Sequence, residues 1–233
     1  MRIRRASIAA ALLALGGAWL LAPPSGATSM KPLNLSDLVR ESTHIVSGTV
    51  SAVSEGLDLN KIPYTEVQLK VSESIRGENN GKMTFRQFGL QSARPDESGR
   101  KFLGLIAGMP RYAVGDHVVL FLGPTSKIGY RTTVGLGQGH FALRGGTLQN
   151  DLNNSGLFRN LSIRSTSLNE KETALVGTDQ GGVGADTFLG LVRRAVRENW
   201  WAAPGPGNPT PGGPATTTAT PTSIPSEGGP IDE

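Results

Sequence analysis

Residues 108–122 read Gly-Met-Pro-Arg-Tyr-Ala-Val-Gly-Asp-His-Val-Val-Leu-Phe-Leu. A turn rich in glycine and proline leads into five consecutive apolar residues, Val118 to Leu122. A strand on the surface of an open antiparallel sheet alternates apolar with polar side chains, so an unbroken apolar run needs cover on both faces. This stretch therefore predicts a central strand of a closed barrel or a sandwich core, and it names no reaction.

Further strands are expected on both sides of this stretch. After Pro63, the residues Val67, Leu69 and Val71 alternate with polar residues, which is typical of a half-buried strand. Other strands are expected at residues 45–53, 82–88, 129–134 and 140–143, and a short helix capped by Ser36 precedes them. Five or six strands with one short N-terminal helix predict a mostly β fold, a small Greek-key barrel like the oligonucleotide/oligosaccharide-binding (OB) fold.

The first 27 residues are typical of a secretory signal peptide. Three arginines lie within residues 1–5, residues 8–21 are apolar, and small residues precede an expected cleavage after Ala27. The apolar run is shorter than the ~20 residues that a membrane-crossing helix needs; an uncleaved anchor is the alternative. We therefore expect a secreted or periplasmic protein that is exported by the general secretory route.

Charge and cysteine content exclude several functions. Without the three leader arginines the chain has 20 basic and 19 acidic residues, and this near-neutral charge argues against binding to nucleic acid. The chain contains no cysteine, which excludes disulfides, a thiol nucleophile and a cysteine-zinc site. A core of apolar side chains alone must then stabilise the exported protein.

The order of the strand patterns resembles the netrin-like and tissue-inhibitor-of-metalloproteinases-like (TIMP-like) family of OB-like barrels. The resemblance is carried by Ile-Val-x-Gly-x-Val at Ile45–Val50, by the strand end Val71–Gly77 and by the strand entry Val114–Leu122. The Gly-x-Pro-x-aromatic-x-x-Gly-acid turn at Gly108–Asp116 resembles uncharacterised secreted bacterial proteins still more closely. The resemblance covers roughly residues 31–145 and implies a protein-binding barrel.

The family resemblance also implies which residues contact a partner. The inhibitory edge of that family corresponds here to the loops Glu55–Ile62 and Gly89–Arg111. The second loop carries the candidate contact residues Arg94, Arg100 and Lys101. The alternative for these three residues is a solvated loop without a partner.

The amino terminus departs from the family. The animal inhibitors place the amine and carbonyl of a disulfide-tethered N-terminal cysteine on the zinc of the target protease. After the expected cleavage this chain begins at Thr28-Ser29-Met30, with no cysteine. These three residues are binding candidates, but ordering a mobile segment costs about 1–2 kcal/mol per residue. Inhibition by the same chemistry is therefore not expected.

Composition divides the mature chain into three parts. Residues 28–145 are expected to form the barrel, and residues 146–201 an extension that ends in an amphipathic helix at 186–200. The apolar side of that helix favours docking on the barrel, with a membrane or a partner as the alternative. Trp200 and Trp201 at its end would form a sticky patch if they were exposed. Residues 202–233 hold eight of the chain's 15 prolines, which predicts a disordered tail.

Motifs for catalysis or metal binding are missing from the sequence. The three histidines, His44, His117 and His140, are widely spaced, and neither H-E-x-x-H nor G-x-S-x-G occurs. Phe88 is the one ring expected on the wet face of its strand, and a single ring is a weak stacking platform. We expect no enzyme activity, no catalytic residues, no metal and no cofactor.

These observations favour a secreted, non-enzymatic protein-binding module whose partner is another extracytoplasmic protein, a protease among the candidates. The alternative is a barrel that binds cell-envelope glycan or a small ligand, favoured if Phe88, Trp200 and Trp201 line one concave surface. A hydrolase comes third, and it requires a histidine that meets a carboxylate or a serine inside a pocket. Stable membrane insertion after signal cleavage is not expected.

Overall fold

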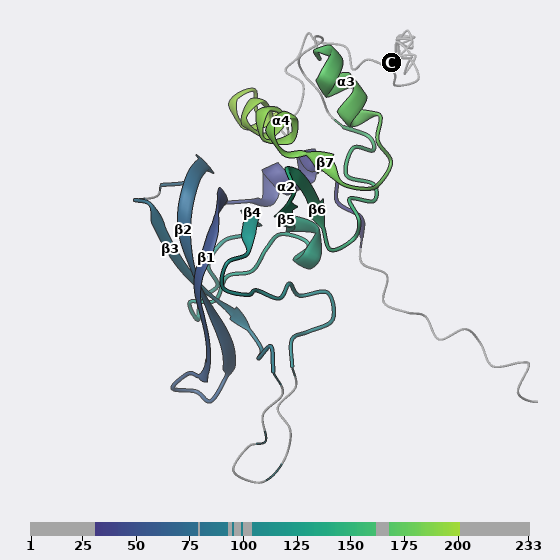
Figure 1. Ribbon diagram of the computed structural model, residues 1–233. Helices are drawn as coiled ribbons and strands as arrows, with labels where there is room; N and C mark the ends of the chain where they lie inside the picture. The colour runs from purple at the N-terminus through teal and green to yellow at the C-terminus, as the bar shows by residue number, and fades with distance from the viewer. Residues whose placement is uncertain are drawn as a thin grey trace, which may run out of the picture. The chain divides into compact units, whose positions relative to one another are not determined.

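The computed structural model describes residues 31–78, 80–92, 95, 99, 104–161 and 168–200. Its centre is one antiparallel sheet of seven strands in the order β3-β2-β1-β4-β5-β6-β7 (Figure 1). The strands are β1 (His44–Leu57), β2 (Pro63–Arg76), β3 (Lys82–Phe88), β4 (His117–Leu122), β5 (His140–Arg144), β6 (Thr147–Asn150) and β7 (Val183–Gly184). The helices are α2 (Leu35–Glu41), α3 (Glu170–Val176) and α4 (Ala185–Arg197), with a 3-10 turn, η2 (Leu136–Gly139). The expected mostly β fold is confirmed.

β4 lies between two apolar cores. Val119 and Phe121 belong to a core that contains α2 and α4, and the alternate residues Val118, Leu120 and Leu122 belong to a core with β2 and β3. Every residue of β4 after His117 is buried. The unbroken apolar run is covered on both faces because successive side chains of a strand point to opposite sides of the sheet.

The expected closed barrel is wrong, because no strand ladder joins the edge strands β3 and β7 within the described residues. Beside β3, the segment after β4 makes single contacts: the Arg131 N–H donates to the Arg86 carbonyl at 2.8 Å. Residues 129–134, expected as a strand, contain only an isolated bridge from Thr133 to Leu122. A barrel strand and a strand between two cores bury the same side chains, so the apolar run does not distinguish them.

The sequence predicted that Ser36 caps α2, and this prediction is wrong: the cap is Asn34. The Asn34 Oδ1 atom accepts a hydrogen bond from the Asp37 N–H at 2.9 Å, and the Asp37 carboxylate accepts one from the Asn34 N–H. Ser36 lies buried in the first helical turn. The reciprocal pair satisfies two N–H groups that lack partners within the helix, which a serine two residues later cannot do.

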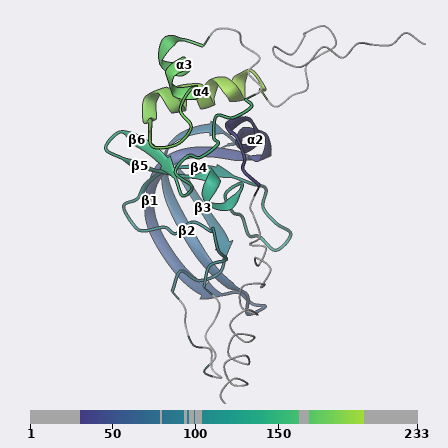
Figure 2. The ribbon, with the colours of Figure 1, turned by 90° about the vertical axis from the view of Figure 1, so that its right-hand side faces the viewer.

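α4 packs on the sheet beside α2 and α3 (Figure 2). The Phe188 ring lies against Phe121 and Phe141, with ring centroids 6.5 and 5.0 Å apart. Arg193 donates to both carboxylate oxygens of Glu73 on β2, at 2.6 and 2.7 Å. This is the docked arrangement that the apolar spacing favours. None of the helices in the described ranges is both long and apolar enough to cross a membrane.

The sheet continues beyond residue 145, the expected end of the barrel. β5 and β6 pair across the turn Gly145-Gly146, and β6 in turn pairs with β7. The expected boundary therefore falls inside a hairpin, and the residues after it complete the same sheet and the same core. The leader and the tail lie outside the described residues.

Candidate functional site

A polar cleft of about 420 Å³ opens beside β4 and β5. One wall is the segment that enters β4, and the other is β5 with the residue that follows β6. The lining residues are Met109, Arg111, Gly115, Asp116, His117, Val118, His140, Ala142, Leu143, Arg144 and Asp151. A volume of this size falls within the range of small-molecule sites, and it also admits a side chain of a partner protein.

His140 and Asp151 form a pair in this cleft. The His140 Nδ1 atom lies 3.2 Å from the Asp151 Oδ1 atom, and the His140 side chain is 7% exposed. The two residues are opposite each other in the β5–β6 hairpin, since Phe141 pairs with Asn150. In the neutral imidazole, a hydrogen bond from Nδ1–H to the carboxylate leaves a lone pair on Nε2.

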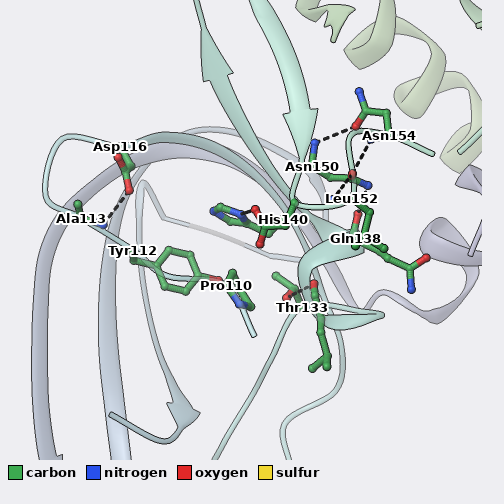
Figure 3. A network of polar contacts seen from close by, with 12 residues as sticks. Pro110, Tyr112, Ala113, Asp116, Thr133, Gln138, His140, Asn150, Leu152 and Asn154 are labelled. Carbon is green, nitrogen blue, oxygen red and sulfur yellow. Dashed lines mark hydrogen bonds and ion pairs between the residues drawn. The ribbon is translucent and has the colours of Figure 1, made fainter. Parts of the chain in front are cut away.

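Two buried polar atoms have no hydrogen-bond partner among the described residues: the Nε2 atom of His140 itself and the hydroxyl of the neighbouring Tyr112. The two rings meet edge to face, with centroids 5.2 Å apart (Figure 3). Burial, and next the nearby charge of Asp151, raise the pKa of Tyr112 well above its usual value. Tyr112 is therefore a neutral hydroxyl at physiological pH.

The turn after β6 holds Asp151 in place. The Asn154 Oδ1 atom accepts from the Asn150 N–H at 2.8 Å, and the Asn150 Oδ1 atom accepts from the Asn154 N–H at 2.7 Å (Figure 3). The Asp151 N–H donates to the Gly137 carbonyl in η2. A Cβ atom on Gly137 would come within 2.8 Å of the Asp151 Cβ, so the close approach of the two segments requires glycine there.

The opposite wall is held by a similar backbone clamp. The Gln91 side chain accepts from the Tyr112 N–H at 2.6 Å and donates to the Tyr112 carbonyl at 2.9 Å. The Asp116 carboxylate accepts from the Ala113 N–H at 2.7 Å. These bonds fix the backbone of the turn before β4. They therefore also fix the positions of Arg111 and Asp116 at the edge of the cleft.

The rim of the cleft carries charges of both signs. Arg111 donates to the Gln91 carbonyl at 2.6 Å and Arg144 is exposed, while Asp116 and Asp151 supply the acids. His117 Nδ1 lies 2.9 Å from the Thr49 hydroxyl on β1. A cleft with separate cations and anions suits a ligand group that both donates and accepts hydrogen bonds.

The His140–Asp151 pair is the base-and-orienter half of a general-base arrangement. None of the described residues that line the cleft carries a hydroxyl or a thiol. Groups of three or more acidic, histidine or cysteine side chains placed to hold a metal do not occur in the described part of the chain. The His140 Nε2 atom is buried, so Asp151, whose side chain is 43% exposed, is the member of the pair that a ligand group can contact from the cleft.

The three histidines do not meet at one site. His140 and His117 both line the cleft, whereas His44 contacts Arg131 through its Nδ1 atom at 3.2 Å. Burial, and next the charge of Arg131, lower the pKa of His44. His44 is consequently held neutral, away from the cleft residues.

Most candidate binding residues from the sequence lie outside the described residues: Thr28, Ser29, Met30, Arg94, Arg100, Lys101 and Trp201. Phe88 is 36% exposed and pairs across the strands with Tyr64, but it does not line the cleft. Trp200 is fully buried, and its indole N–H donates to Glu198 at 2.9 Å. Trp200 is thus part of the core and not an exposed ring. The chain folds back after α4, where the Trp200 N–H donates to the Ala195 carbonyl.

Sequence reasoning missed Asp151, Arg144 and Asp116 as site residues. A usable signal exists for the first: Gly145-Gly146 between apolar runs is typical of a tight hairpin turn. Continuing the two strands outward from that turn places His140 opposite Asp151. Arg144 and Asp116 come together with them only because β4 lies beside β5 in the sheet.

No family model, no curated protein and no solved structure matches the chain.

Proposed function

We propose that this protein is an exported, non-enzymatic binding module that holds a polar group of an extracytoplasmic partner protein in the cleft. The observation that carries the proposal is the continuity of the cleft with the long loop between β3 and β4. Met109 and Arg111, at the end of that loop, form part of one wall of the cleft. A partner that lies along the loop, as the family resemblance implies, would also reach Asp116 and Arg144.

The netrin-like and TIMP-like relationship is part of this proposal. The strand order β4-β1-β2-β3 supports it, because β4 returns beside β1 after a long connection, and this is the order of a Greek key. The proposed partner class is a protease or another secreted protein. Export through a signal peptide that is removed after Ala27 is proposed on the leader pattern alone.

The proposal is tested with residues 28–233 as bait against the secreted proteins of the source. We expect a specific protein to be retained at moderate salt, and Arg144→Glu to abolish its retention because the reversed charge repels the bound acceptor. Arg159→Glu is the control, since Arg159 is also exposed and does not line the cleft. Equal retention by both variants would contradict the proposal, and retention only on cell-wall material would favour the glycan alternative.

The glycan alternative loses one of its conditions among the described residues. It required Phe88, Trp200 and Trp201 on one concave surface, and Trp200 is buried in the core. The cleft residues that the structure describes include no aromatic ring other than imidazole. Carbohydrate sites usually stack sugars on such rings, so the protein-binding proposal is the better supported of the two.

A second candidate function is hydrolysis, because His140 meets a carboxylate in the cleft at 3.2 Å. In that mechanism the His140 Nε2 atom, which is buried in this structure and must first become accessible, takes a proton from water as the water oxygen attacks an ester or amide carbonyl. The imidazolium, stabilised by Asp151, then gives the proton to the alcohol or amine that leaves as the C–O or C–N bond breaks. Hydrolysis of p-nitrophenyl acetate by the full mature chain and by Asp151→Asn tests it. A loss of about 100-fold or more in the variant supports hydrolysis, and equal rates contradict it.

A further inference from the structure

One carboxylate locks the turn between β1 and β2. The Asp58 Oδ1 atom accepts hydrogen bonds from the N–H groups of Asn60 and Ile62, at 2.9 and 2.8 Å. The Asp58 Oδ2 atom accepts from the Tyr130 hydroxyl at 2.9 Å, and Tyr130 ends the turn 124–130. The two turns are therefore fixed to each other. The β1–β2 turn lies at the end of the sheet that is farthest from α3 and α4 (Figures 1 and 2).

Besides Leu57, which is 44% exposed, each of these turns presents one apolar and one basic side chain to solvent. Leu59 is fully exposed, and Ile128 is more than half exposed. Lys61 and Lys127 are exposed, and their side chains make no ion pair or hydrogen bond within the described ranges. The only acid in either turn, Asp58, uses both oxygens in the bonds that lock them.

Folding does not explain the two apolar side chains. Neither Leu59 nor Ile128 belongs to either apolar core. Because both side chains are exposed, they add little apolar burial that would stabilise the sheet. The turns that carry them are nevertheless held rigid by hydrogen bonds. Rigid turns lose little conformational entropy on binding, so they are suited to insert exposed side chains into another surface.

The surface that matches this pattern is apolar beneath an anionic layer. Aliphatic side chains of interfacial segments enter the boundary between headgroups and acyl chains, and nearby lysines are attracted to anionic headgroups. Two unpaired lysines beside two aliphatic side chains offer both contacts. A second copy of this chain would instead bring four lysines together, which repel one another.

We propose that the turns 57–62 and 124–130 form a docking surface for membranes that contain anionic lipid. The contact is peripheral, since only the tips of two turns enter the interface. It is independent of the proposed function of the cleft, because no residue of either turn lines the cleft.

The test is co-sedimentation of residues 28–233 with vesicles of equal parts phosphatidylcholine and phosphatidylglycerol, and with vesicles of phosphatidylcholine alone. We expect binding to the anionic vesicles only. Lys61→Gln with Lys127→Gln should weaken binding by about 25-fold, roughly fivefold for each lysine. Leu59→Ser with Ile128→Ser should weaken it by about tenfold or more.

The matched control is Val114→Ser with Lys70→Gln, because both side chains are exposed, Val114 to 67%. They lie away from the two turns, since Lys70 is in the middle of β2 and the residue after Val114 bonds to Val50 in the middle of β1. This pair should leave binding unchanged. No binding to anionic vesicles, equal binding to both vesicles, or an equal loss in the control pair would overturn the proposal.

A second measurement does not depend on affinity. The chain has no cysteine, so Leu59→Cys places a single polarity-sensitive dye at the tip of the turn. Its emission should shift to the blue with anionic vesicles, whereas the same dye at Val114→Cys should not shift. A shift at both positions, or at neither, would overturn the proposal.

Discussion

At the scale of the residue, Tyr130 links two parts of the chain that the sequence places far apart. Its hydroxyl donates to Asp58, 72 positions away. Burial, and next this hydrogen bond, raise the pKa of Tyr130 to about 12. The backbone N–H of Ile62 first, and the Tyr130 hydroxyl next, lower the pKa of Asp58. The pair is therefore a neutral donor and a charged acceptor over the whole neutral range.

This bond predicts a pH dependence of stability at alkaline pH. The pKa of tyrosine is about 10 in the unfolded chain, so the contribution of Tyr130 is complete below about pH 10. It is lost as the pH rises through about 12, where the folded protein releases the same proton. We expect the difference in unfolding free energy between the natural chain and Tyr130→Phe to shrink over this window. Urea unfolding on both sides of pH 10 measures it, and a constant difference would contradict the assignment.

Asn154 supports the cleft through three backbone partners. Its side chain accepts from the Asn150 N–H and donates to the carbonyls of Leu148 and Gly181. Asn154→Ala leaves these buried groups without partners, which we expect to cost about 3 kcal/mol of unfolding free energy. Chemical denaturation measures the loss. The exposed Asn80→Ala should cost little, and a similar cost for both variants would show that Asn154 has no special role.

At the scale of the element, α4 is part of the core and not an appendage. Phe188 is fully buried against Phe121 and Phe141 of the sheet. The bidentate pair between Arg193 and Glu73 lies at the edge of the same contact, where solvent screens it. The apolar face of the helix therefore supplies most of its stabilisation, and the ion pair supplies little.

Two substitutions in α4 separate these contributions. Phe188→Ala should lower the unfolding free energy by about 4 kcal/mol, because it removes a buried ring and leaves a cavity. Arg193→Ala should lower it by less than about 1 kcal/mol. Thermal unfolding compares the two variants directly. A larger loss for Arg193→Ala would mean that the helix is attached by charge.

At the scale of the whole molecule, the sheet and both cores extend across the expected boundary at residue 145. β6 and β7 lengthen the sheet, and α4 covers one face of it. We expect a chain of residues 28–145 to lack a cooperative unfolding transition, because the loss of α4 exposes Phe121 and Phe141. Residues 28–201 should unfold in one transition at the same temperature as residues 28–233. Calorimetry of the three chains measures this. Cooperative unfolding of residues 28–145 would show that these residues fold as a domain of their own.

The sequence by itself determined most strand positions and the burial of β4. Alternation in β2, the limits of Lys82–Phe88 and the apolar run of β4 all depend on local periodicity, which the fold preserves. The spacing of apolar residues also determined that α4 has a face to bury. Local patterns reveal which side chains are buried, but they do not reveal what covers them.

Only the tertiary structure decided that the sheet is open, that Trp200 is buried, and that His140, Asp151 and Arg111 share a cleft. The cleft depends on β4 pairing with β1 and β5, and on the long loop that ends at Arg111. Such pairings join residues that are distant in the chain, and their energy comes from packing and loop closure. A single sequence carries no local signal of that energy, so the site emerges only when the strands are in place.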